Sequence, residues 1–333
     1  MALPIIAISM GDPAGVGPEL VVKALERRAV KPVCRPLVVA DPAVMAGAAG
    51  LLGSGLRFRT IPEASQARFE PTEMDVICPP GLVVGPVTFA RVDAAMGEAA
   101  ARCLRHAFEL AIAGQVEGVV AAPMNKQAFH LAGYHYLDEL AYLADFTHCR
   151  DTYTMGVMGS LWTVPVTQHV AFEDVPALIT KERVLLHIVR LHRVLLAVMG
   201  REPALAVAAL NPHGGEGGLF GRQEIDAIAP AVQAAREQGV DARGPFPADT
   251  IFVRALAGEF HGVVCMYHDQ ANIARKLHGM LTGATLYMGL PVPAATTSHG
   301  TAFDKAGKGI ADPSSLEAAL RYVALLAGAE RST

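Results

Sequence analysis

Three histidines stand just beyond apolar runs of the sequence, where a metal ion or a substrate could reach them. His169 follows TVPV, His213 follows ALAVAAL and His268 follows GVVCMY. A single histidine at a strand end is more often a hydrogen-bonded cap than a metal ligand. Three in equivalent places favour one divalent ion, with further positions open for water or substrate. Their wide spacing is no local metal signature, so this prediction depends on the strands sharing one edge of a sheet.

Two aspartates could complete such a site. Asp249 lies in GPFPADT, and Asp269 is the neighbour of His268. Either carboxylate could bind the ion, orient an imidazole or accept a hydrogen bond from a substrate hydroxyl. The alternatives are a turn cap for Asp249 and a surface acid for Asp269.

Two glycine-rich stretches could approach a ligand closely. GDPAGVGPE, residues 11–19, matches neither the Rossmann nor the Walker pattern, and Glu19 already places a negative charge at the start of the next helix. We therefore interpret it as a tight turn from strand to helix. SHGTAFDKAGKG, residues 298–309, could hold a dinucleotide through backbone amides or be only a loop before the last helix. The candidate cofactor-binding residues of this stretch are Gly300, Thr301, Ala302 and Asp304.

Apolar runs that alternate with helical patterns predict an α/β fold. PIIAISM, CRPLVVA, GVVAAP, TVPV, ALAVAAL and GVVCMY are typical of parallel strands covered on both faces. Helical periodicity covers about 95–115 and about 175–199. The polar clusters follow the strands, at the edge where open α/β sheets bind ligands.

Composition excludes several classes of protein. The chain has 333 residues, of which 52% are apolar and 18% charged, with a formal net charge of -4. There is no basic footprint for nucleic acid, and no apolar run approaches the roughly 18 residues of a membrane span. The start of the chain lacks the features of a signal peptide. Five scattered cysteines suit buried thiols in a reducing compartment. We expect a cytoplasmic globular protein.

The motifs, in their order along the chain, resemble those of the 4-hydroxythreonine-4-phosphate dehydrogenase family of vitamin B6 synthesis. They are MGDPAGVGPE, PMNKQAFHLAGY, LNPHGGEGG, GPFPADT, MYHDQ and SHGTAFDKAGKG. The resemblance implies a homodimer with a three-layer α/β/α fold like that of isocitrate and isopropylmalate dehydrogenases, with the active site between two lobes. We expect one lobe at 1–127 plus about 295–333, and the other at about 128–294.

The same resemblance implies NAD or NADP as hydride acceptor and a divalent metal, which could be zinc, magnesium, manganese or cobalt. His169 and His213 then correspond to metal ligands of one subunit, and His268 to a third ligand from its partner. Asp249 and Asp269 match positions beside metal and substrate. Lys276 matches a substrate-binding lysine that we expect to serve the reaction, and Lys126 a second substrate contact.

The sequence departs from the family pattern where the substrate phosphate would be held. Glu139 and Leu140 stand where the family has histidine and threonine, while Thr285 and Ala294 replace an asparagine and an arginine. A carboxylate repels a phosphate dianion, and loss of an arginine removes its strongest partner.

These replacements predict a dehydrogenase that oxidises and decarboxylates a non-phosphorylated β-hydroxy acid. Terephthalate cis-1,2-dihydrodiol, the substrate of a related group of dehydrogenases, is the expected example. The first alternative is 4-hydroxythreonine-4-phosphate dehydrogenase itself, a step of pyridoxal phosphate synthesis. The second alternative, from another class, is a non-catalytic protein that binds metal or metabolite on the same fold.

Overall fold

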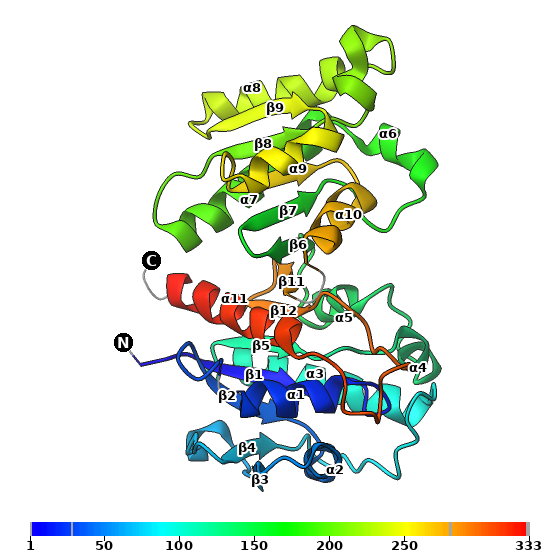
Figure 1. Cartoon of the computed structure of the whole chain (residues 1–333), viewed down its shortest axis with the longest axis vertical. Helices are drawn as coiled ribbons and strands as arrows, with labels where there is room; N and C mark the ends of the chain where they lie inside the picture. Colours follow the sequence, from blue (N-terminus) through cyan, green and yellow to red (C-terminus); the bar gives the residue numbers. More distant parts are fainter. Residues whose placement is uncertain (1, 28, 280–281, 331–333) are drawn as a thin grey trace. The chain divides into compact units, whose positions relative to one another are not determined.

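Strands that alternate with helices build the whole chain (Figure 1), as the sequence predicts. The structure is a computed structural model that describes residues 2–27, 29–279 and 282–330. It divides into two compact units. Unit 1 is Met1–Tyr153 with Ala284–Thr333, and unit 2 is Thr154–Gly283.

The boundaries of these units differ from the lobe boundaries expected near residues 127 and 295, both of which lie inside unit 1. Residues 128–153 stay with unit 1 because the helix that begins at Lys126 packs closely on the preceding long helix. A Cβ atom on Gly97 would collide with the backbone of Ala128. Residues 284–294 also stay with unit 1, because the strand Gly283–Met288 pairs with the strand Ala294–Thr297.

Unit 1 is built on a mostly parallel sheet. Its strands are β1 (Ile5–Ser9), β2 (Arg35–Val39), β3 (Arg57–Thr60), β4 (Glu73–Ile77), β5 (Gly118–Ala121), β11 (Gly283–Met288) and β12 (Ala294–Thr297). Their order is β3-β4-β2-β1-β5-β12-β11, and β11 alone runs antiparallel to its neighbour β12.

Helices cover both faces of this sheet. They are α1 (Gly17–Glu26), α2 (Pro42–Leu52), α3 (Ala94–Ile112), α4 (Lys126–Leu131), α5 (Glu139–Phe146) and α11 (Ser314–Glu330), with a short turn η1 (Ala64–Gln66). Helix α3 packs on β1, β2 and β5, while α11 packs on β1, β5 and β12 and touches α1. Ile6 and Ile8 are completely buried between these layers, which explains why β1 is apolar along its whole length.

Unit 2 repeats this arrangement with a smaller sheet. Its strands are β6 (Tyr153–Met158), β7 (Leu161–Pro165), β8 (Leu205–Ala208), β9 (Ala242–Phe246) and β10 (Gly262–Cys265), in the order β6-β7-β10-β8-β9. Strands β7, β10, β8 and β9 are parallel, and β6 runs antiparallel to β7. The order places β10, the last of these strands in sequence, between β7 and β8.

The helices of unit 2 pack on this sheet. They are α6 (Val175–Leu178), α7 (Lys181–Met199), α8 (Ala229–Glu237), α9 (Ala248–Leu256) and α10 (His268–Gly279), with the short turns η2 (Phe172–Asp174), η3 (Pro212–Gly218) and η4 (Glu224–Ile228). The helical zone predicted over 175–199 is two helices, because Thr180 starts a new one by accepting a hydrogen bond from the Arg183 amide. The helix predicted over 95–115 is confirmed as α3. Among the described residues, no helix has the length and apolar character needed to cross a membrane.

Candidate active site

The three predicted metal-binding histidines follow three neighbouring parallel strands of unit 2. His169 comes after β7, His268 begins α10 directly beyond β10, and His213 lies in η3 after β8. Because β7, β10 and β8 are adjacent and parallel, their carboxyl ends lie at one edge of the sheet. The expectation that these histidines share an edge is therefore confirmed within unit 2.

Strand order decides which of the histidines meet. The ring centroids of His169 and His268 are 5.8 Å apart, since their strands are direct neighbours. His213 instead lies with its ring 6.1 Å from that of Phe220. The close pair within one chain is thus His169 with His268, whereas the resemblance implied His169 with His213.

The loop that carries His213 has an unusual backbone. Five successive residues from His213 to Gly217 have positive φ, including 54° at His213 and 43° at Glu216. Residues with a side chain adopt this region at an energetic cost, so it persists only where the surroundings enforce it. Glycine at 214, 215 and 217 lowers the cost.

A buried carboxylate enforces this conformation. Glu224 is only 3% exposed and accepts hydrogen bonds from the backbone amides of Leu210 and Asn211, both at 2.8 Å. Its second oxygen accepts from the Asn211 side chain at 2.9 Å. A Cβ atom at Gly215 would lie 2.6 Å from that oxygen. Glu224 thus anchors the start of the His213 loop and lies against its middle at Gly215. No local pattern in the sequence singles it out.

The predicted acidic and basic partners lie on the helices that follow. Asp269 lies in the first turn of α10, with its carboxylate 3.4 Å from Nδ1 of His268. Asp249 is exposed in the first turn of α9, and Lys276 is exposed in the last turn of α10. Within the described part of the chain, no group of three or more His, Cys, Asp or Glu side chains is arranged to hold a metal ion. One chain brings together two of the three imidazoles.

The predicted substrate residues belong to unit 1, and the sheet gathers two of them on one face. The β11–β12 register pairs Thr285 with Thr296 and Tyr287 with Ala294. Alternate residues of a strand share a face, and so do residues directly opposite each other. Thr285, Tyr287, Ala294 and Thr296 therefore point to the same side. Neither strand carries a lysine or an arginine.

Glu139 lies close enough to Tyr287, on this same face, for its charge to affect the tyrosine. Burial raises the pKa of Tyr287 well above its ordinary value, and the negative charges of Glu139 and Asp138 raise it further. Glu139 is the first residue of α5, and Leu140 beside it is buried. Three of the four replaced positions thus gather around a phenol that stays protonated near a carboxylate. Lys126 is an exposed cation at the start of α4, whose first turn is capped by Asn125.

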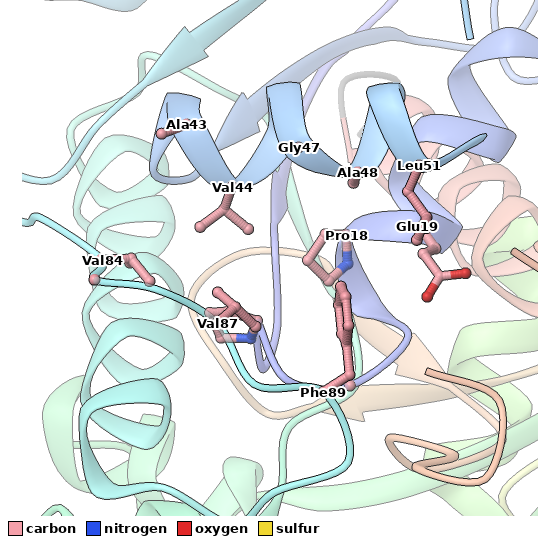
Figure 2. A pocket seen from close by; sticks show the side chains of 13 residues that line it. Pro18, Glu19, Ala43, Val44, Gly47, Ala48, Leu51, Val84, Val87 and Phe89 are labelled. Carbon is pink, nitrogen blue, oxygen red and sulfur yellow. The ribbon is translucent and has the colours of Figure 1, made fainter. Parts of the chain in front are cut away.

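The predicted cofactor loop is fastened to α1. Glu19 is buried and accepts hydrogen bonds from the amides of Gly307 at 2.7 Å and Gly309 at 2.8 Å. The Lys23 ammonium donates to the carbonyls of Gly309 and Ala311. The prediction of a tight turn after β1 is confirmed. The carboxylate of Glu19 (Figure 2) is the anion that the amides of Gly307 and Gly309 bind. The amides of Gly307 and Gly309 are therefore already used.

The first part of this loop, residues 300–304, carries the four candidate cofactor-binding residues and lies beside the β1–α1 turn. Thr301 accepts a hydrogen bond from the Val16 amide at 3.1 Å, and a Cβ atom on Gly15 would lie 2.9 Å from the Thr301 Cβ. Ala302 has φ 42°, while Gly300 and Asp304 are exposed. The candidate cofactor residues thus lie next to the GDPAG turn rather than apart from it.

Sequence reasoning missed Asp12, a buried carboxyl in the same turn. It is fully shielded from solvent; one oxygen accepts from the Ala14 amide at 2.8 Å, and the other has no hydrogen-bond partner among the described residues. Burial raises the pKa of Asp12 to about 6, and the negative charge of Asp93 also raises it, while the Ala14 bond lowers it. The signal was its position directly beyond an apolar strand, in GDP.

Known proteins resemble the chain over nearly its whole length. Residues 32–323 match the family described as pyridoxal phosphate biosynthetic protein PdxA. D-threonate 4-phosphate dehydrogenase of Cupriavidus necator is 40% identical over 326 residues, which cover 98% of this chain and 98% of that protein.

Solved structures give the same picture. A 4-hydroxythreonine-4-phosphate dehydrogenase from Burkholderia phymatum is 39% identical with a TM-score of 0.83, covering 98% of this chain and 99% of that one. A terephthalate 1,2-cis-dihydrodiol dehydrogenase from Burkholderia xenovorans is 29% identical with a TM-score of 0.65, at 98% and 99% coverage. The predicted fold class, like that of isopropylmalate dehydrogenase, is confirmed.

Proposed function

Because the chain belongs to the family of the pyridoxal phosphate biosynthetic protein PdxA, we propose that it is a metal-dependent, NAD(P)-linked dehydrogenase that oxidises and decarboxylates a β-hydroxy acid. The observation that carries the proposal is the placement of His169, His268 and His213 after three adjacent parallel strands. Imidazoles grouped at a strand edge are the donor set of a catalytic metal site.

The described residues fit a divalent metal in part. His169 and His268 supply two imidazoles with ring centroids 5.8 Å apart, beside the Asp269 carboxylate, and His213 is the third predicted ligand. A zinc, magnesium, manganese or cobalt ion, when bound, lowers the pKa of a substrate hydroxyl and stabilises the negative charge that develops as CO2 leaves.

The side chains around the histidines have distinct tasks in this proposal. Asp269 orients the His268 ring through Nδ1, which directs the other ring nitrogen outward. Asp249 accepts the substrate hydroxyl proton, and the Lys276 ammonium binds the carboxylate that is lost as CO2. NAD or NADP takes the hydride.

We propose a homodimer in which His268 also serves the partner's site. Unit 2 exposes large apolar side chains near the histidine loops, and these support a partner surface. They are Phe172 (70% exposed), Leu219 (74%), Val253 (69%), Ile273 (58%) and Leu277 (82%). Burial of this set in a dimer would make both metal affinity and activity depend on protein concentration.

The leading substrate class is a phosphorylated four-carbon hydroxy acid, such as D-threonate 4-phosphate or 4-phosphohydroxy-L-threonine. It is supported by the 40% identity to the Cupriavidus necator enzyme and by the TM-score of 0.83 to the Burkholderia phymatum structure. The terephthalate dihydrodiol enzyme, which matched our first expectation, is more distant at 29% and 0.65. Lys126 is the cation of unit 1 that we assign to the phosphate.

One observation keeps a non-phosphorylated acid as the second candidate. The face of β11 and β12 that carries Thr285 and Ala294 has a buried phenol and a nearby carboxylate, Glu139, and neither strand contributes a cation. Such a face favours a neutral or apolar group over a phosphate dianion.

The test compares His169→Ala and His268→Ala with His192→Ala, a half-buried position of α7 that pairs with Glu202. We expect the first two to lower kcat/KM by at least about 100-fold, and the binding of Co2+ by a similar factor, because each removes a ligand. The His192 variant should match the wild type. Wild-type turnover by both ligand variants would refute the metal assignment. Absence of turnover by the wild type with either substrate class would favour a non-catalytic protein.

A further inference from the structure

The buried side of α10 is polar, which is uncommon for a helix that packs on a sheet. The helix packs on β7 and β10 (Figure 1), and the side chains that it buries are Gln270, Ala271 and Arg275. Its large apolar side chains, Ile273 and Leu277, are instead 58% and 82% exposed. A surface helix normally turns its apolar stripe toward the core. Polar contacts must therefore hold α10, the helix that carries three of the predicted site residues.

Gln270 holds the first turn of α10. It is buried, and its side-chain oxygen accepts a hydrogen bond from the Met266 amide at 2.7 Å. Its side-chain nitrogen donates to the Ala209 carbonyl at 2.9 Å. These two bonds join the start of the helix to the residues that follow β10 and β8. The second half of the helix, where Lys276 lies, needs other contacts.

Arg275 supplies the contact for that second half. It is only 5% exposed, and burial lowers the pKa of its guanidinium to about 10, so the group still carries its charge at neutral pH. A Cβ atom on Gly156 of β6 would lie 2.5 Å from the guanidinium carbon. Glycine inside a strand often marks such a close approach. Gly156 therefore makes room for the arginine between α10 and the sheet.

A path of hydrogen bonds leads from Arg275 to the first predicted ligand of α10. Arg275 donates to Oδ1 of Asn272, and the Asn272 side-chain nitrogen donates to the His268 carbonyl at 3.0 Å. On the other side of Arg275, the strand that carries Gly156 pairs with β7, the strand that His169 follows. Arg275 thus connects the hairpin before one predicted metal ligand with the helix that begins at another.

We infer that Arg275 is a positioning residue of the proposed active site, which fixes α10 against β6 and thereby sets the place of His268 relative to His169. The inference rests on the proposed function, because it takes these two imidazoles as ligands of one metal ion. Their ring centroids are 5.8 Å apart, a separation that depends on where α10 lies on the sheet. Loss of a contact that orients a metal ligand costs about 10–100-fold in metal affinity.

Arg275→Met separates positioning from general stability. Methionine is apolar and nearly as long, and replacing a buried charge by an apolar side chain of similar size is often neutral or stabilising, so the urea midpoint should not fall. The dissociation constant of Co2+ should nevertheless rise about ten-fold and kcat/KM should fall by a similar factor, while the dissociation constant of NADH stays unchanged. Arg193→Met, the same replacement at an exposed position of α7, should match the wild type throughout.

Gly156→Ala displaces the guanidinium while the arginine is retained. The added methyl group would collide with the guanidinium, which is the flexible end of its side chain and must leave its place. We expect a loss of Co2+ affinity of about ten-fold here too, and no further loss when Gly156→Ala is combined with Arg275→Met, because both changes break one contact. Additive losses would overturn the inference, since the two residues would then act separately.

Hydrogen exchange of the α10 amides, followed by mass spectrometry on the full-length, metal-free protein, gives a readout that needs neither metal nor turnover. We expect these amides to exchange about ten-fold faster in Arg275→Met than in the wild type, and the α7 amides to exchange at the same rate in both. Unchanged exchange in α10, or faster exchange throughout unit 2 with a lower urea midpoint, would overturn the inference. If the wild type binds no Co2+ and forms no NAD(P)H, the proposed function fails, and the exchange rates alone then decide whether Arg275 fixes α10.

Discussion

Glu224 offers the sharpest structural test of the His213 loop. The carboxylate accepts hydrogen bonds from the amides of Leu210 and Asn211 and from the Asn211 side chain, at 2.8, 2.8 and 2.9 Å. Glu224→Ala leaves three donors without this partner in a site that is 3% exposed in the wild type. Each unsatisfied buried donor costs about 1–3 kcal/mol. Because the loop can relax toward water, we expect a total cost of about 3 kcal/mol.

That cost should appear at His213. A loop that loses its anchor no longer holds five residues at positive φ, so the imidazole spends less time in position to bind metal. A cost of about 3 kcal/mol corresponds to roughly a 100-fold loss. We therefore expect the dissociation constant of Co2+ to rise about 100-fold and kcat/KM to fall similarly, while the dissociation constant of NADH stays unchanged.

Two further variants make this prediction specific. Glu224→Gln keeps the oxygen that accepts both backbone amides and loses only the Asn211 contact, so its effect should be about ten-fold. Glu237→Ala removes an exposed glutamate from the end of α8 and should leave metal binding unchanged. Wild-type Co2+ affinity in Glu224→Ala would refute the positioning role, and equal losses in all three variants would indicate a general loss of stability.

Three other predictions concern unit 1. Burial raises the pKa of Asp12 from 3.8 to about 6, so its contribution to the free energy of unfolding is complete below about pH 4 and is lost as the pH rises through about 6. In urea unfolding, Asp12→Asn should lack this loss of about 3 kcal/mol between pH 4 and pH 6. If the free energy of unfolding falls equally with pH in the wild type and the variant, the prediction is wrong. Glu139→Gln removes a negative charge near Tyr287. Kinetics followed by NADH formation should show KM about three-fold lower for a phosphorylated acid and unchanged for a non-phosphorylated diol acid. Equal changes of KM for both substrates would argue against a phosphate near Glu139. Glu19→Ala leaves the amides of Gly307 and Gly309 without their partner and should lower the free energy of unfolding by about 2–4 kcal/mol, so an unchanged urea midpoint would contradict the anchoring role.

The sequence predicted the edge of the sheet but not the neighbours along it. Apolar runs followed by histidines place His169, His213 and His268 at strand ends, because strands and their ends have local signatures. That His268 lies beside His169 depends on β10 inserting between β7 and β8. Strand order is a long-range property that no local pattern in one sequence specifies, so the pairing within a chain could not be predicted.

The buried polar anchors could not be predicted from the sequence for a related reason. Glu224 is more than ten positions beyond Asn211, and its role arises only when η4 folds back under the η3 loop. The segment before α3 is likewise joined to the start of α2 by the hydrogen bond from the Val84 amide to Asp41, a contact between residues more than forty positions apart. The unit boundaries differ from the expected ones because α4 packs on α3, a contact that apolar periodicity does not reveal.

The central claim is that the chain is a metal-dependent, NAD(P)-linked dehydrogenase. The most direct measurement follows absorbance of NAD(P)H with D-threonate 4-phosphate, 4-phosphohydroxy-L-threonine and terephthalate cis-1,2-dihydrodiol, each with and without a chelator. We predict NAD(P)H formation with at least one of the phosphorylated acids, lost with the chelator and restored by added divalent metal. Turnover that resists the chelator, or no NAD(P)H from any of the three acids, would contradict the claim.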